Sequence, residues 1–237
     1  MGVLPDCIVL PGCAILLPWL VKTALPSLSE TDMRTLIYIP VIHTQADMGA
    51  LAGAIRRLSI EKLGHQEWER SVKAIDQLWT GIRETIEKLD LLYPRVRLYQ
   101  DGLPNCGREV QIVTDLANAG SPNHQLLFFL MGKGATLMGT ESADLLLEEY
   151  QLVQQVLSAQ DLGEAERVQA RQESLSHSLL ERRDKYISER INETLCEEET
   201  GMLFLGMLHS LEEKLAKDIQ VHYPILHPAH PKGRKGR

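Results

Sequence analysis

Residues 201–209, Gly-Met-Leu-Phe-Leu-Gly-Met-Leu-His, form the stretch that most constrains the fold of this chain. A charged helical pattern precedes this short apolar run, and a Leu/Glu/Lys-rich segment follows it. These features are typical of a strand that is buried in a parallel sheet. The carboxyl end of such a strand faces the crevice in which α/β proteins bind ligands. The pattern therefore places His209 at a predicted binding crevice.

Two further apolar runs end in a similar way. Residues 36–42, Leu-Ile-Tyr-Ile-Pro-Val-Ile, lead directly into His43. Residues 135–138, Ala-Thr-Leu-Met, lead through a Gly-Thr pair into Glu141. Three predicted strands thus end in His, Glu and His, and this is the most informative feature of the sequence.

Strands alternate with helices along residues 35–223. The predicted strands cover 35–42, 96–100, 135–138, 202–208 and 219–223. The predicted helices cover 48–63, 66–90, 107–118, 122–131, 142–158, 163–195 and 210–217. This alternation predicts a single α/β domain with a mostly parallel central sheet of about five strands, flanked by helices, with long helices inserted between strands. Pro40 lacks an N–H donor, so the first strand is expected at an edge or a bulge.

Composition limits the classes of function. The chain has 237 residues, 44% of them hydrophobic and 24% charged, as is usual for a soluble globular protein. Its net charge of -7 gives no support to nucleic-acid binding. The cysteines form no C-x-x-C pair, which favours a reducing, cytoplasmic location without disulfides. They are Cys7, Cys13, Cys106 and Cys196.

The two ends of the chain are expected to lie outside the domain. Residues 7–28 are largely apolar, but three prolines and Lys22 interrupt them, and no basic residue precedes them. They therefore make a poor membrane-spanning helix and a poor secretory signal. We expect residues 1–34 to be a poorly ordered or mis-started apolar leader, with a membrane-bound or exported form as the alternative. Residues 224–237 are expected to be a solvated basic Pro/His tail.

Histidine and carboxylate side chains at strand ends are the ligands that Zn, Mn, Co or Fe(II) prefer. The sequence therefore predicts a divalent transition metal held by His43, Glu141 and His209. Such a metal keeps open positions for water and lowers the pKa of that water, which makes a nucleophile. The alternative is that each histidine is a hydrogen-bonded structural residue, as most buried polar groups are.

Other polar residues have simpler interpretations. Asp47 is expected to cap the helix that follows it, and Asp101 to belong to a turn. Arg183 and Asp184 lie in the middle of a predicted helix and are compatible with a surface ion pair of little energetic value. No constellation surrounds His65, His124 and His177. The chain has no P-loop, G-x-G-x-x-G, G-x-S-x-G or H-E-x-x-H motif, so nucleotide-dependent and serine-hydrolase functions lack support.

The same residues resemble the TraB/Tiki/ChaN superfamily, which includes pheromone-shutdown, GumN-type and haem-uptake relatives. That family has two G-x-x-H motifs near the chain ends, an intervening Glu, and an Arg on a helix before the second motif. Here Gly206-Met-Leu-His209 is similar to the second motif, Glu141 to the acidic position and Arg183 to the helix Arg. Pro40-Val-Ile-His43 keeps the His of the first motif but has Pro where the family has Gly.

The resemblance spans about residues 35–222 and implies an α/β fold. In the Tiki branch it implies metal-dependent peptide hydrolysis, whereas other branches are binding or regulatory proteins. We therefore expect a metal-dependent hydrolase-like protein, peptidase-like in the Tiki manner, that acts on a small molecule or peptide. In it, Arg183 would orient Glu141 or stabilise a developing oxyanion.

Two alternatives come from other classes of function. The same pocket suits a noncatalytic regulatory module that binds haem, a peptide or another small ligand. A helix-rich interaction protein would instead use residues 66–90 and 164–195 to pack against partners. The sequence predicts no oligomeric state.

Overall fold

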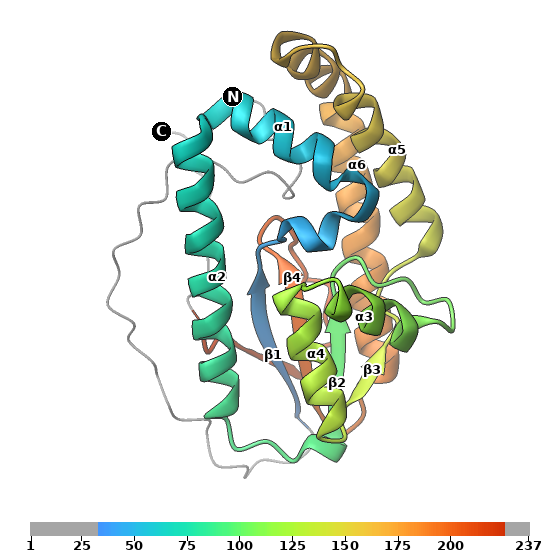
Figure 1. Cartoon of the computed structure of the whole chain (residues 1–237). Helices are drawn as coiled ribbons and strands as arrows, with labels where there is room; N and C mark the ends of the chain where they lie inside the picture. Colours follow the sequence, from blue (N-terminus) through green and yellow to red (C-terminus); the bar gives the residue numbers. More distant parts are fainter. Residues whose placement is uncertain (1–32, 226–237) are drawn as a thin grey trace, which may run out of the picture.

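The structure is a computed structural model that describes residues 33–225, and within them five parallel strands form one sheet in the order β3-β2-β4-β1-β5 (Figure 1). The strands are β1 Arg34–Val41, β2 Val96–Gln100, β3 Thr136–Met138, β4 Thr200–Gly206 and β5 Ile219–His222. The helices are α1 Ala52–Leu63, α2 His65–Glu87, α3 Glu109–Asn118, α4 Pro122–Gly132, α5 Ala143–Leu157 and α6 Leu162–Thr194, with the 3-10 helices η1 Gln45–Leu51 and η2 Tyr93–Arg95. The predicted α/β class with a parallel central sheet is confirmed. Residues 1–32 of the predicted leader and 226–237 of the basic tail lie outside the described residues, as do Cys7 and Cys13, whereas Arg34 belongs to β1 rather than to a leader.

Helices cover both faces of the sheet, with α2 and α4 on one side and α6 on the other (Figure 1). Alternate strand residues therefore enter two different cores. The first core contains Ile37, Ile39, Trp79, Leu98, Leu127 and Phe204. The second core contains Leu36, Tyr99, Ile187, Ile191, Leu203 and Leu205. Because both faces are buried, the central strands β1 and β4 contain continuous apolar runs rather than alternating ones.

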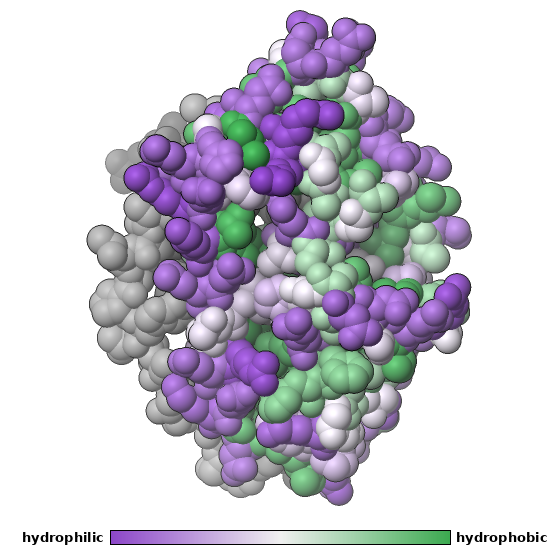
Figure 2. All heavy atoms as spheres, viewed as in Figure 1, coloured by the Kyte–Doolittle hydropathy of each residue, from purple (hydrophilic) through white to green (hydrophobic). Residues whose placement is uncertain are grey.

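All five strands point the same way, so their carboxyl ends share one edge of the sheet, close to η1 and the loops before α3 and α5 (Figure 1). Hydrophilic residues dominate the outer side of α2 and the tip formed by the α5–α6 hairpin (Figure 2). Among the described residues, no helix is both long and apolar enough to cross a membrane.

Two helix predictions need correction. The helix predicted over 48–63 is preceded by η1 and contains a kink at Gly49, whose φ of 49° is a left-handed conformation that favours glycine. The helix predicted over 210–217 is instead a series of turns. The side chain of Asn192 holds these turns, because it donates to the carbonyl of Lys214 and accepts from the N–H of Ala216. The bonds to Asn192 therefore take the place of hydrogen bonds that a helix over 210–217 would form within itself.

Pro40 lies in a strand that is inside the sheet rather than at its edge. However, β5 pairs only with residues Arg34–Ile37 of β1, so the β5 side of β1 is open at Pro40. The absent N–H donor is tolerated there because β5 supplies no strand partner at that position.

At Gly139, the loop that carries Glu141 passes close to the backbone of Asn105. A Cβ added at Gly139 would lie 2.5 Å from the Cα of Asn105, whose N–H donates to the carbonyl of Glu141 at 2.8 Å. We expect Gly139→Ala to destabilise the protein by about 1–3 kcal/mol in urea unfolding, because backbone must shift to admit the methyl group. Gly132→Ala is the control, since a Cβ at Gly132 would meet nothing within 4 Å. Equal stabilities of the two variants would contradict this expectation.

Candidate functional site

Polar side chains from four strand ends and two helices meet at the carboxyl edge of the sheet. We call this group the strand-end network: His43, Asp101, Glu141, Glu149, Arg183, Asp184 and His209. His43 follows β1, Asp101 follows β2, Glu141 follows β3 and His209 follows β4. The four residues expected at the site from sequence, including Arg183, are therefore brought together.

Arg183 of α6 is the centre of the network. Its Nε and Nη2 donate to the two oxygens of Glu141 at 2.6 and 2.7 Å. Nη2 also donates to Oδ1 of Asp101 at 2.8 Å, and Nη1 donates to Oε1 of Glu149 at 2.5 Å. Burial alone would lower the pKa of Arg183, but these three carboxylates hold it well above its usual value. Arg183 is therefore a buried, charged link between the sheet and α5.

Hydrogen bonds fix both the side chain and the backbone of Glu141. Both of its oxygens accept from Arg183, and Oε1 also accepts from the N–H of Gly102 at 2.7 Å. Its backbone N–H donates to the carbonyl of Leu103 at 3.0 Å. Its side chain is 1% exposed. These contacts make Glu141 a residue that orients Arg183.

Asp101 lies between the two histidines. Nε2 of His43 is 3.6 Å from Oδ2 of Asp101, and Nε2 of His209 is 3.8 Å from Oδ1. The N–H of Gly206 also donates to Oδ2 at 3.0 Å. Burial would raise the pKa of Asp101, but His43, His209 and Arg183 hold it well below its usual range. Asp101 is therefore a carboxylate with an imidazole on each side.

His209 is oriented by Asp184. The Nδ1–H group of His209 donates to Oδ1 of Asp184 at 2.6 Å, and the N–H of Ser210 donates to Oδ2 at 3.0 Å. Burial alone would lower the pKa of His209, but the bond to Asp184 and the charge of Asp101 raise it. A histidine whose ring is fixed by a carboxylate at Nδ1 presents Nε2 in a defined direction.

One simpler sequence interpretation is wrong, because Arg183 and Asp184 are buried rather than a surface pair. Asp101 lies in the predicted turn, but its side chain also accepts a hydrogen bond from Arg183. The physical reason that the α6 pair is buried is the packing of α6, which buries Ile187 and Ile191 against the sheet. Positions 183 and 184, one turn earlier, are thereby directed to the strand ends. The spacing of four between Arg183, Ile187 and Ile191 is the sequence signal that indicates this burial.

The predicted metal ligands do not fit a metal centre in this arrangement. Within residues 33–225, no group of three or more His, Cys, Asp or Glu side chains is placed so that it could hold a metal ion. Glu141 has a guanidinium against both of its oxygens, and that positive charge would repel a divalent cation. Metal ligation by His43, Glu141 and His209 stays a prediction.

A second polar cluster joins the loop after β1 to α4. Contrary to the sequence prediction, Asp47 does not cap the helix that follows it: Thr44 is the N-cap of η1, and Asp47 is the N3 residue of a capping box that accepts hydrogen bonds from the backbone and side chain of Thr44. Ser121 donates to Asp47, and Nδ1 of His124 lies 3.2 Å from Asp47 Oδ1. His124 therefore does have a constellation around it, contrary to the sequence interpretation. Burial would raise the pKa of Asp47, but His124, Ser121 and Thr44 lower it to about 2.

This low pKa predicts acid sensitivity. A carboxyl whose pKa is lower in the folded state contributes stability above its unfolded pKa of 3.8 and loses it as the pH falls toward 2. We expect about 2 kcal/mol of the free energy of unfolding to disappear between pH 5 and pH 2 in the wild type. Asp47→Asn should lack this contribution, so the wild type and the variant should become closer in free energy of unfolding as the pH falls. Urea unfolding at several pH values measures both free energies. A difference that does not change with pH would contradict this prediction.

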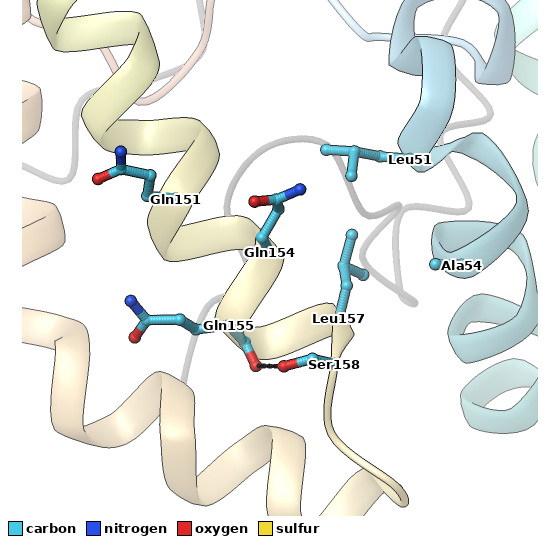
Figure 3. Close-up of a pocket in the computed structure, with 7 residues that line it drawn as sticks. All are labelled: Leu51, Ala54, Gln151, Gln154, Gln155, Leu157 and Ser158. Carbon is cyan, nitrogen blue, oxygen red and sulfur yellow. Dashed lines mark hydrogen bonds between the residues drawn. The ribbon is translucent and has the colours of Figure 1, made fainter.

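A groove of about 600 Å³ lies between α1 and α5 (Figure 3). Its lining residues are uncharged: Leu51, Ala54, Gln151, Gln154, Gln155, Leu157 and Ser158. Leu51 and Ala54 face Gln154 and Leu157 across the gap (Figure 3). The volume is in the range of small-molecule sites, but no lining residue belongs to the strand-end network.

Comparisons with protein-family models, with curated proteins and with solved structures find no match to this chain. The resemblance to the TraB/Tiki/ChaN superfamily therefore stays a prediction.

Proposed function

We propose that the protein is a hydrolase-like enzyme in which His43 is the general base and His209 stabilises negative charge, on either side of Asp101. One observation carries this proposal: a single buried carboxylate has an imidazole Nε2 on each side, at 3.6 and 3.8 Å. Hydrolysis needs one group that takes a proton from water and other groups that stabilise the developing negative charge. The position of these groups at the carboxyl edge of a parallel sheet supports the proposal, because ligands bind there in α/β proteins.

The accessibility of the histidines supports separate roles. The side chain of His43 is 15% exposed, whereas that of His209 is 3% exposed. His43 would take the proton from water while the water oxygen bonds to the electrophilic atom of the substrate. Asp101 would stabilise the imidazolium that forms. His209 and Arg183 would supply positive charge for a developing oxyanion.

The proposed reaction uses no metal ion. We expect a chelator to leave turnover unchanged, and the metal content of the protein to be well below one ion per chain. A near-stoichiometric transition metal that is lost in both His43→Ala and His209→Ala would replace the proposal with the metal-dependent form that the sequence predicts.

A panel of fluorogenic esters, amides and peptides tests the activity itself. We expect His43→Asn and His209→Asn to lower kcat by about 10²-fold or more. His177→Asn is the control, because His177 is an exposed residue of α6 whose ion pair with Glu181 lies at the surface, away from the strand-end network. Variants as active as this control would overturn the proposal. A stable ligand complex without turnover would favour the noncatalytic binding module instead.

A further inference from the structure

Glu149 differs from the other carboxylates of the strand-end network in its access to solvent. Its side chain is 35% exposed, whereas Asp101, Glu141 and Asp184 are buried. One oxygen, Oε1, accepts from Arg183, and among the described residues no donor binds Oε2. Glu149 is therefore the network carboxyl that an outside molecule can reach.

Glu149 and His43 stand at opposite ends of one chain of contacts. Glu149 bonds Arg183 at 2.5 Å, Arg183 bonds Asp101 at 2.8 Å, and Asp101 lies 3.6 Å from His43. The groups between these two ends are buried. The network thus has a carboxyl and an imidazole that are both partly exposed to solvent, and general acid–base catalysis uses groups of these two kinds.

The surroundings of Glu149 raise its pKa. Burial raises the pKa of Glu149, and the negative charges of Asp101 and Glu141 raise it further, against the lowering effect of Arg183. Asp101, the buried carboxylate of the same network, has a pKa well below its usual range. Environments that separate the pKa values of neighbouring carboxyls are typical of acid–base assignments.

We propose that Glu149 is the proton donor of this site, the group that protonates the leaving atom of a substrate while water attacks with help from His43. This inference rests on the proposed function. The proton on Oε2 of Glu149 passes to the leaving atom as the bond to the electrophilic atom breaks. The water oxygen forms the new bond, and the water proton goes to His43. Proton exchange with solvent then restores Glu149 and His43, so water is the only co-reactant.

The neighbouring pair of residues offers a matched control. Glu148 of α5 accepts from Arg182 of α6 at 2.8 Å, and both side chains are exposed. Glu149 and Arg183 repeat that pairing one residue later on each helix, but on the buried side. Glu148→Gln therefore makes the same chemical change at a similar ion pair without touching the network.

The turnover test uses a substrate that the wild type hydrolyses, prepared with two leaving groups: p-nitrophenolate, which needs no proton, and an alkoxide or amine, which does. We expect Glu149→Gln to lower kcat on the poor leaving group by about 10²-fold or more, and on the p-nitrophenyl ester by only a few-fold. Glu148→Gln should match the wild type on both. Equal losses on the two substrates, or no loss, would overturn the donor role.

A second measurement does not depend on turnover. In protein labelled with ¹³C at the glutamate carboxyls, the Glu149→Gln spectrum identifies the Glu149 signal. We expect its titration midpoint to lie above 4.5, the ordinary value for glutamate. A midpoint at or below 4.5 overturns the donor role alone, even in an active enzyme. A wild type that hydrolyses nothing overturns the proposed function and the donor role together, whatever the midpoint.

Discussion

Replacing Arg183 with methionine is expected to lower the free energy of unfolding by about 3–5 kcal/mol, because it leaves buried carboxylates without their cation. Arg183 makes two bonds to Glu141 and one to Asp101, and both carboxylates are buried. Methionine has a similar volume but offers no donor, so the desolvation of both charges stays uncompensated. Urea unfolding at pH 7 measures the difference.

Arg182→Met is the matched control. Arg182 is the preceding residue, and its pairing with Glu148 is exposed to solvent, so we expect a loss of no more than about 1 kcal/mol. Adding Glu141→Gln to Arg183→Met should recover part of the loss, since it removes one of the unpaired charges. If Arg183→Met lowers the free energy of unfolding no more than Arg182→Met does, the strand-end network is not a buried ion network.

The sheet was predictable because its central strands are buried on both faces. Residues 202–205 and 36–39 are apolar without interruption, and this pattern has few alternatives when Gly and charged helices flank it. Parallel strands also fix which residues meet, since every carboxyl end lies at one edge. The convergence of His43, Glu141 and His209 follows from that rule.

The remaining site residues depend on tertiary contacts that sequence patterns do not specify. Asp101 precedes a glycine in a polar turn, and local turn chemistry explains it equally well. Glu148 and Glu149 are adjacent glutamates, and only the rotation of α5 against α6 decides which one meets Arg183. The bonds from Asn192 to residues 214 and 216 connect distant segments, so the helical pattern of 210–217 gave no indication of them.

The pairing of His209 with Asp184 predicts a loss of stability at alkaline pH. The folded-state pKa of His209 is raised above its usual value of 6.5. A raised pKa contributes stability that is fully present below the unfolded pKa and is lost as the pH rises through the folded pKa. We therefore expect the free energy of unfolding to fall as the pH rises above 6.5. Urea unfolding between pH 6 and pH 9 measures this fall.

Asp184→Asn isolates the cause. The Asn carbonyl can still accept from Nδ1–H of His209, but the carboxylate charge that raises the pKa is absent. We expect this variant to be less stable than the wild type at pH 6 and to approach it at pH 9. His222 does not produce the same signature, because burial lowers its pKa and its effect on stability lies below pH 6.5, where stability rises with pH. An alkaline fall that persists unchanged in Asp184→Asn would show that His209 is not held as an imidazolium by Asp184. The positive charge assigned to His209 at the oxyanion would then have no basis.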